Sequence, residues 1–231
     1  MRLLIPLLLM ILPHTQPLAD PLPPPGQRSV DDVVAAYSDK ISSRLLPRFQ
    51  FAGVAWPPER VVLVATKDTR RLELWVLEGA EWVRVREYRI KGMSGGSGPK
   101  LREGDRQVPE GFYNVTHLNP NSRFHFSMKL DYPNLFDRAQ AERDGRSDLG
   151  GDIFIHGGVL STGCLAVGDN AIEELFVLAA EIGSERISVL ISPKDFRYRP
   201  LEPLSPETPP WVFELHQQIA ANLERFPLSG R

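Results

Sequence analysis

One stretch of the sequence, FIHGGVLSTGCLAVGD, places the chain's single cysteine eight residues after a histidine. His156 ends an apolar segment, and Cys164 follows a glycine-rich turn centred near residue 160. If the chain folds back there as a wide hairpin, the two residues face each other, with Cβ atoms about 4.5–5.5 Å apart. A histidine at that separation can take the thiol proton, and the thiolate can then attack a carbonyl carbon.

Other residues of this stretch could serve the same reaction. The backbone N–H groups of Gly163 and Cys164 could bind the oxyanion that forms when a carbonyl is attacked. Ser161 and Thr162 could orient the substrate or the imidazole, and Gly157 lets a substrate approach the backbone. The alternative is a buried, inert cysteine beside a strand-end histidine. A lone thiol in a glycine-rich loop favours catalysis over that alternative.

Two other kinds of site can contain a cysteine and a histidine. A metal could be bound if His117, His125, His156 and Cys164 converged. The sequence has no HExxH or CxxC motif and no close pair of ligands on one helix, so we predict no metal and no cofactor. A papain-like peptidase is excluded by residue order, because its cysteine precedes its histidine, whereas only His216 follows the cysteine here.

A second informative stretch, MSGGSGPKLREGDRQVPEGFY, covers residues 93–113. Its GGSGPK segment differs from a phosphate-binding loop, because Leu101 follows Lys100 where serine or threonine is needed and no helix is expected there. The stretch is either an ordinary surface loop or a charged flap over the cleft. In the second case Lys100 and Arg102 would be available to an anionic substrate.

The elements that must position these residues follow from hydrophobic periodicity. Runs of Val, Leu, Trp and Tyr from Arg60 onward, broken by turn residues, predict a β-meander. Further strands are expected at 111–118, 123–130, 151–158 and 186–192. Helices are expected at 29–46, 133–145, 170–182 and 211–225. Ser29 and Asp169 are the expected N-caps of the first and third of these helices.

The first residues, MRLLIPLLLMILPHTQPLAD, are typical of a signal peptide. Arg2, the apolar run over 3–12 and Ala19 predict a leader over 1–19 that is cleaved before Asp20. A retained membrane anchor is disfavoured, because a bilayer span needs about 20 apolar residues. We therefore predict export to the periplasm and no membrane span in the mature form.

Length and charge limit the remaining possibilities. The chain has 231 residues, 42% of them hydrophobic, which is enough for one sizeable core. Its net charge is −2 and no basic run exceeds two residues, so we predict no nucleic-acid partner.

The quoted motifs resemble a known family. The IHG of 155–157 and the STGC of 161–164 resemble the active-site signature of the L,D-transpeptidase catalytic domain, the YkuD-like family. The segments GPKLREGDRQVPEGFY, DYPNLFD and CLAVGDNAIEELF are similar to its YafK-like branch. The resemblance covers roughly residues 58–192. It implies a catalytic domain that is mainly β, of sandwich or barrel type, with peripheral helices.

The resemblance also implies a chemistry. Members act on peptidoglycan stem peptides, attack the carbonyl at the L-centre of the third residue, often diaminopimelate, and pass the resulting thioester to an amine or to water. By motif position, Cys164 would be the nucleophile and His156 the base. Gly163 would belong to the oxyanion hole, and Ser161 would support the site.

Two departures from the family pattern bear on the acyl acceptor. Many members have histidine where this chain has Thr162, and arginine where it has Ala166. The enzyme is therefore expected either to cross-link stem peptides or to act as an amidase that releases peptides, or a wall-linked lipoprotein, from diaminopimelate. A non-catalytic wall-binding module is the remaining alternative, although such a module would be expected to lose Cys164 or His156.

These expectations divide the chain into four parts. A signal peptide (1–19) is followed by a proline-rich linker with an N-terminal helix (20–57). The catalytic domain (58–192) comes next. A second proline-rich segment with a C-terminal helix (193–231) ends the chain.

Overall fold

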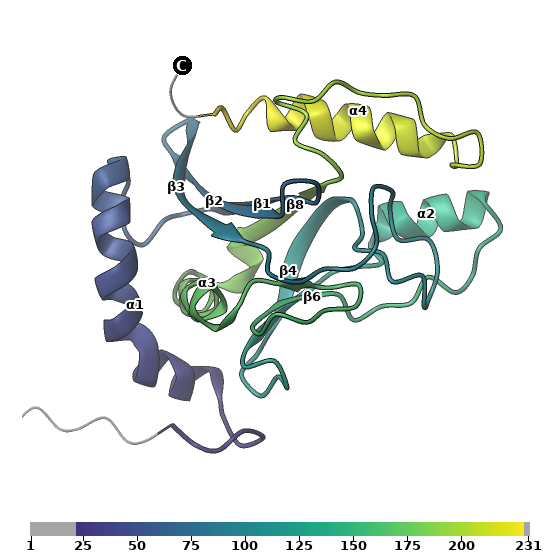
Figure 1. Cartoon of the computed structure of the whole chain (residues 1–231). Coiled ribbons are helices and arrows are strands. Elements are labelled where there is room, and N and C mark those ends of the chain that lie inside the picture. The colour runs from purple at the N-terminus through teal and green to yellow at the C-terminus, as the bar shows by residue number, and fades with distance from the viewer. Residues whose placement is uncertain (1–21, 229–231) are drawn as a thin grey trace, which may run out of the picture.

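The computed structural model describes residues 22–228, coloured in Figure 1. The predicted signal peptide over 1–19 lies outside the described residues. Within residues 22–228, no helix has the length and apolar character needed to cross a membrane.

The described part of the chain is built on one curled, eight-stranded mixed sheet. The strand order is β3-β2-β1-β8-β4-β5-β6-β7, in which β1 lies parallel to β8 and β6 parallel to β7, and the other neighbouring pairs are antiparallel. The strands are β1 (Val61–Thr66), β2 (Arg71–Glu78), β3 (Glu81–Arg89), β4 (Gly111–Asn119), β5 (Ser127–Leu130), β6 (Phe154–His156), β7 (Leu165–Ala166) and β8 (Ile187–Ser192). The predicted fold class, mainly β with peripheral helices, is confirmed.

Helices cover both faces of the sheet (Figure 1). They are α1 (Val30–Ala52), α2 (Leu135–Arg143), α3 (Asp169–Ile182) and α4 (Trp211–Leu223), with a short 3₁₀ helix over Ser184–Arg186. Alternate residues of β1 point to opposite faces, as in any strand. Leu63 and Ala65 therefore join the core beneath α1 and α3, while Val64 joins a second cluster with α4.

The first helix begins as predicted but continues further. Ser29 caps α1 in a capping box with Asp32. The helix was expected to end at residue 46, before Pro47, yet it continues to Ala52 and ends at Gly53 with a φ of +70°. The reason is packing: Phe49, beyond the proline, is buried in the main core.

Two other local predictions were wrong. The strand expected at 123–130 forms only over β5, and residues 120–126 make a turn, here called the cleft turn, that connects β4 to β5. Asp169 was expected to be the N-cap of α3, but the cap position belongs to Gly168. The Asp169 carboxylate instead accepts a hydrogen bond from the Gly158 N–H (2.7 Å), which joins the helix to the end of β6.

The cleft turn is held from two sides. Residues 22–29, here called the strap, lie against Asn121, whose side chain accepts from the N–H groups of Gly26 (2.8 Å) and Arg28 (3.0 Å) and donates to the Arg28 carbonyl. On the other side His125 contacts Glu173 of α3 (3.1 Å). The N-terminal segment and α3 together therefore fix a turn that lies far from both in the sequence.

A buried charge cluster, Lys67, Glu110 and His216, anchors the loop over residues 93–110. The Lys67 ammonium donates to the carbonyls of Gly98 (2.9 Å) and Val108 (3.0 Å) and pairs with Glu110 (2.9 Å). The second carboxylate oxygen of Glu110 contacts His216 of α4 (2.8 Å). Burial lowers the pKa of Lys67, while the Glu110 charge opposes that shift. The base of the predicted flap is therefore tied to the sheet and to α4.

Candidate active site

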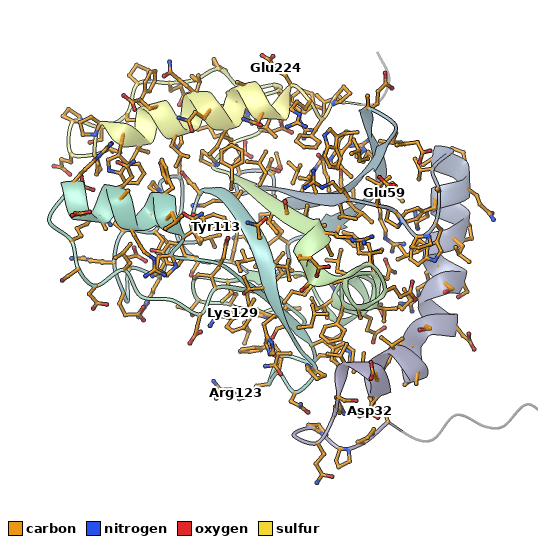
Figure 2. The ribbon with its side chains drawn as sticks, turned by 180° about the vertical axis from the view of Figure 1, so that it is seen from behind. Asp32, Glu59, Tyr113, Arg123, Lys129 and Glu224 are labelled. Atoms are coloured by element: carbon orange, nitrogen blue, oxygen red, sulfur yellow. The ribbon has the colours of Figure 1, made fainter. Side chains whose placement is uncertain are left out.

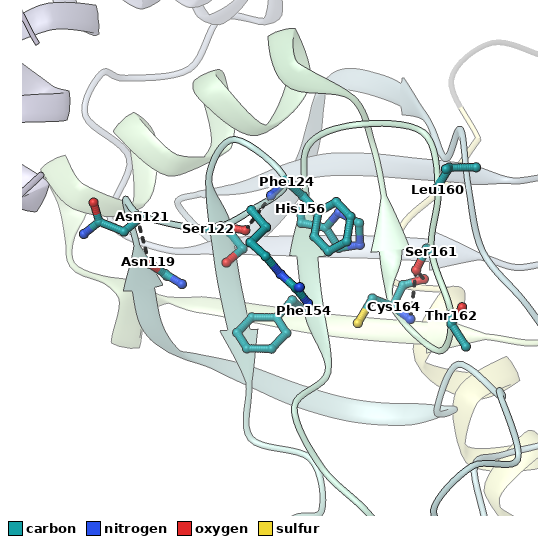
Figure 3. Close-up of a pocket in the computed structure, with 12 residues that line it drawn as sticks. Asn119, Asn121, Ser122, Phe124, Phe154, His156, Leu160, Ser161, Thr162 and Cys164 are labelled. Atoms are coloured by element: carbon teal, nitrogen blue, oxygen red, sulfur yellow. Dashed lines mark hydrogen bonds between the residues drawn. The ribbon is translucent and has the colours of Figure 1, made fainter. Parts of the chain in front are cut away.

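A cleft of about 580 Å³ lies between the cleft turn, β6 and the residues that lead into β7 (Figure 3). The segment 157–164, here called the catalytic turn, forms one wall. Of the predicted site residues, the cleft brings together His156, Ser161, Thr162 and Cys164. The full lining is Asn119, Asn121, Ser122, Arg123, Phe124, Ser127, Phe154, His156, Leu160, Ser161, Thr162 and Cys164.

The predicted hairpin between histidine and cysteine was wrong. Strands β6 and β7 are parallel, with Ile155 opposite Leu165 and His156 opposite Ala166. The catalytic turn therefore crosses over instead of folding back, and Cys164 is not the cross-strand partner of His156. Both side chains nevertheless line the same cleft, into which the Cys164 sulfur points in Figure 3.

The imidazole of His156 is neutral and has the tautomer in which Nε2 can accept a proton. Its Nδ1 lies 2.7 Å from the carbonyl oxygen of Gly157. Because a carbonyl only accepts, Nδ1 carries the proton, and Nε2 of the neutral ring then holds the lone pair. Burial lowers the pKa of His156, which keeps the ring neutral at physiological pH. The ring of Phe124 covers it, with centroids 4.6 Å apart.

The thiol of Cys164 is protonated in this resting arrangement. Burial raises its pKa, the backbone of Phe154 lowers it through a hydrogen bond, and the charges of Asp152 and Lys100 act in opposite directions. The thiol donates a long hydrogen bond to the Asp152 carbonyl (3.6 Å). Cys164 and His156 therefore line the cleft as two neutral groups, a thiol and an imidazole, each hydrogen-bonded to a backbone carbonyl.

Hydroxyl groups hold the catalytic turn in shape. The Ser161 Oγ accepts from the Cys164 N–H (3.1 Å) and donates to the Cys164 carbonyl (2.8 Å). The Gly163 N–H donates to the Oγ of Ser94 (2.8 Å), which in turn donates to the Arg106 carbonyl (2.7 Å). Both N–H groups predicted for the oxyanion hole are thus bonded within the protein, and their catalytic role stays a prediction.

Ser94 is a residue that sequence reasoning missed. It connects the loop 93–110 to the catalytic turn across 69 positions of sequence. A serine in the segment MSGGSG carries no spacing signal, so nothing in the local pattern distinguishes it from Ser97, which lies in the same loop and is exposed. Arg123 and Phe124 of the cleft turn were missed for a different reason, because the sequence pattern assigned them to a strand.

The proposal that Lys100 offers a free ammonium to the substrate was wrong. The side chain is buried, and its Nζ donates to Asp105 (2.9 Å) and to the carbonyl of Arg102 (2.8 Å). The Asp105 carboxylate folds the loop back on itself by also accepting the N–H groups of Leu101 and Arg102. Arg102 is exposed and does not line the cleft.

Gly157 is required for packing, and its predicted role in substrate approach stays a prediction. A Cβ at this position would lie 2.4 Å from the Phe124 carbonyl oxygen and 2.7 Å from the Asp169 carboxylate. Only glycine therefore lets β6 end directly against the cleft turn. Thr162 is exposed on the catalytic turn and faces the cleft.

Metal ligands do not gather in the described part of the chain. Among residues 22–228, no group of three or more His, Cys, Asp or Glu side chains could hold a metal ion. His125, one of the histidines considered as a ligand, pairs with Glu173 instead.

The family model described as YkuD, L,D-transpeptidase catalytic domain, matches residues 59–189. The chain belongs to this family. The matched region contains the whole cleft lining, including Cys164 and His156.

Among curated proteins, the chain is similar to YafK from Escherichia coli (strain K12), whose name provisionally assigns it to the L,D-transpeptidases. The two are 36% identical over 132 residues, which is 55% of this chain and 51% of YafK. The chain thus spans about half the length of the curated relatives it matches.

Solved structures show a weaker likeness. The helical cell shape determining protein Pgp2 from Campylobacter jejuni is 26% identical with a TM-score of 0.49, and the match covers 61% of this chain and 50% of Pgp2. Bd1075 from Bdellovibrio bacteriovorus is 22% identical with a TM-score of 0.44, and the match covers 74% of this chain and 57% of Bd1075. The family assignment rests on the family model and not on these likenesses.

Proposed function

We propose that the protein is an exported cysteine enzyme that acts on peptidoglycan stem peptides through a thioester on Cys164. The observation that carries this proposal is that the chain's single thiol and a neutral imidazole, whose Nε2 holds the lone pair, line the same cleft. A wall-binding module without activity would need neither the tautomer nor the thiol.

The reaction follows from these two groups. The substrate carbonyl, at the L-centre of the third stem residue, enters the cleft beside Cys164. His156 takes the thiol proton at Nε2 while the sulfur attacks the carbonyl carbon, and the imidazolium then protonates the departing amine. The acyl group stays on sulfur as a thioester until an amine or water, deprotonated by the same imidazole, displaces it.

The oxyanion of this reaction needs hydrogen-bond donors. The N–H groups of Gly163 and Cys164 lie next to the sulfur in sequence, and each is bonded to a serine hydroxyl at rest. A hydroxyl is a weaker acceptor than an oxyanion, so these N–H groups can turn to the oxyanion if it forms within their reach.

Hydrolysis is a second candidate outcome, and one observation favours it. Ala166, at the position where many relatives carry arginine, is fully buried in β7. The cleft therefore lacks a cation at that place to hold an acceptor peptide, whereas water needs no such anchor. An amidase that releases peptides or a wall-linked lipoprotein from diaminopimelate is consistent with this arrangement.

Purified protein incubated with tetrapeptide muropeptides and, separately, with protein-linked muropeptides tests both candidates. We expect intact-mass spectra to show an acyl adduct on the wild-type chain and none on Cys164→Ala. Cross-linked dimers would identify a transpeptidase, and shortened peptides or released protein would identify a hydrolase. Turnover by Cys164→Ala would contradict the thioester mechanism.

Export is tested separately. We expect the chain in the periplasmic fraction to begin near Asp20. An intact mass that retains residues 1–19 would contradict a cleaved signal peptide.

A further inference from the structure

The cleft is lined by one residue with a permanent charge, Arg123 at the tip of the cleft turn. Its side chain is exposed at the periphery of the molecule (Figure 2) and forms no hydrogen bond or ion pair with any of residues 22–228. Nearby cations differ in this respect. Lys129 pairs with Asp152 (2.7 Å) and Lys100 pairs with Asp105 (2.9 Å).

The backbone that carries Arg123 is fixed on both sides. Asn121, two residues before it, holds the strap through three hydrogen bonds. His125, two residues after it, has a φ of +74° and contacts the buried carboxylate of Glu173. Phe124, its direct neighbour, covers the catalytic imidazole. The guanidinium is therefore a free cation on a rigid base, one residue away from the aromatic cover of the catalytic base.

The electrostatics of the cleft favour an anion at this position. His156 is neutral because burial lowers its pKa, and the remaining lining side chains carry no formal charge when the thiol is protonated. No acidic side chain lines the cleft to compete for the guanidinium. A planar guanidinium binds a carboxylate through two parallel hydrogen bonds, which adds orientation as well as affinity.

We propose that Arg123 is a specificity-determining residue that binds one free carboxylate of the peptide donor and thereby places the scissile carbonyl against Cys164. This inference rests on the proposed function, since it takes a carboxylate-bearing stem peptide as the donor. A tetrapeptide donor offers three free carboxylates. One is on the side-chain centre of diaminopimelate, one is on the glutamate residue before diaminopimelate, and one is the C-terminal carboxylate of the residue after diaminopimelate.

The test compares Arg123→Gln with a matched control, Arg138→Gln, which removes an exposed arginine on α2 outside the cleft. Four donors are supplied: a tetrapeptide with all carboxylates free, and three versions in which one of the three carboxyl groups is an amide. Acylation of Cys164 is followed by intact mass, and thiol integrity is checked with iodoacetamide, which is neutral.

With the free donor, Arg123→Gln is expected to lower the acylation rate about 10- to 100-fold. The donor whose amide replaces the bound carboxylate should react equally slowly with wild type and with Arg123→Gln, because it has nothing left for Arg123 to bind. That donor identifies the carboxylate. Iodoacetamide should alkylate all variants at the same rate. An equal loss on every donor, or no loss on any, would overturn the inference.

A binding measurement separates this inference from the proposed function. In the Cys164→Ala background, calorimetry with the free donor should show a dissociation constant about tenfold higher or more for Arg123→Gln than for the parent. Wild-type protein that binds the donor with this dependence but never forms an adduct would contradict the proposed function alone. Unchanged binding would overturn the role of Arg123 even if acylation occurs.

Discussion

Two histidines of almost equal exposure, 3% for His156 and 4% for His216, have opposite surroundings. The Nδ1–H of His156 donates a hydrogen bond to the adjacent Gly157 carbonyl, and Nε2 has no hydrogen-bond partner among residues 22–228. His216 directs Nε2 to the buried carboxylate of Glu110, which also holds Lys67. Low exposure alone therefore does not distinguish a base from a structural residue.

The two histidines differ in whether the polar groups around them find all their hydrogen-bond partners within the protein. The cluster around Glu110 satisfies its donors and acceptors within the protein, and it gains a fixed loop and a docked α4. In the cleft, Nε2 of His156 and the Arg123 guanidinium have no hydrogen-bond partner among residues 22–228, and the thiol is bonded to backbone groups alone. The imidazole nitrogen and the exposed guanidinium are therefore available to a ligand, whereas the groups of the Glu110 cluster are bonded to one another.

Replacing each histidine with glutamine gives the largest expected difference between the two sites. His156→Gln removes the proposed base for Cys164, so acylation by a peptide donor should slow about 100- to 10,000-fold with little change in melting temperature. His216→Gln should lower the melting temperature and leave the acylation rate close to wild type. Equal kinetic losses in the two variants would remove the distinction.

Glu110→Ala tests the structural side alone. The substitution leaves the Lys67 charge buried without its partner, and we expect the free energy of unfolding to fall by about 3–5 kcal/mol. Glu59→Ala, which removes an exposed carboxylate, is the matched control. Chemical denaturation measures both variants. A loss near zero for Glu110→Ala would show that the cluster does not stabilise the fold.

The neutral state of the catalytic pair predicts a pH dependence. Only the thiolate reacts with iodoacetamide, so the alkylation rate of Cys164 should increase about tenfold per pH unit below the pKa of the thiol. An ordinary thiol has a pKa of about 8.5. Because burial raises the pKa of Cys164, its rate should still be rising above that pH. The lowered pKa of His156 places the acid limb of donor acylation below about pH 6.5. An alkylation rate that levels off near neutral pH would indicate a preformed thiolate–imidazolium pair instead.

Ser94→Ala should have the smallest effect. It removes one hydrogen bond from the catalytic turn, worth about 1 kcal/mol, so donor acylation should slow about fivefold. Ser97→Ala, in the same loop but without a contact to the turn, should react as wild type does. If the two variants behave alike, Ser94 does not position the turn.

The sequence was informative where periodicity and burial act together. The meander of β1 to β3, strand β8 and helix α3 have long apolar patterns, and all lie near their predicted positions. The candidate residues Cys164 and His156 could also be selected from the sequence, because a lone cysteine near a histidine in a glycine-rich segment is rare, and the structure places both in one cleft. Their surroundings could not be inferred, since the contact between Ser94 and Gly163 spans 69 residues and leaves no local pattern.

The direction of the strands beside Cys164 could not be read from sequence. Strands β6 and β7 have three and two residues, too few for a pattern that distinguishes parallel from antiparallel pairing. A further partner of β7, Gly92, bridges to Ala166 from another part of the chain, which a local pattern does not reveal. Lys100 was misassigned for a similar reason, because its partner Asp105 could be recognised only once the loop was folded.

The strap has a practical consequence for anyone who labels or immobilises this protein. Because residues 22–29 lie against the wall of the cleft through Asn121, an affinity tag fused directly before them would start near the cleft that we propose as the substrate site. The last described residues, after α4, lie at the other end of the molecule (Figure 1). A tag, dye or surface linker placed there leaves the cleft open, so it is the attachment point for assays with bulky wall fragments.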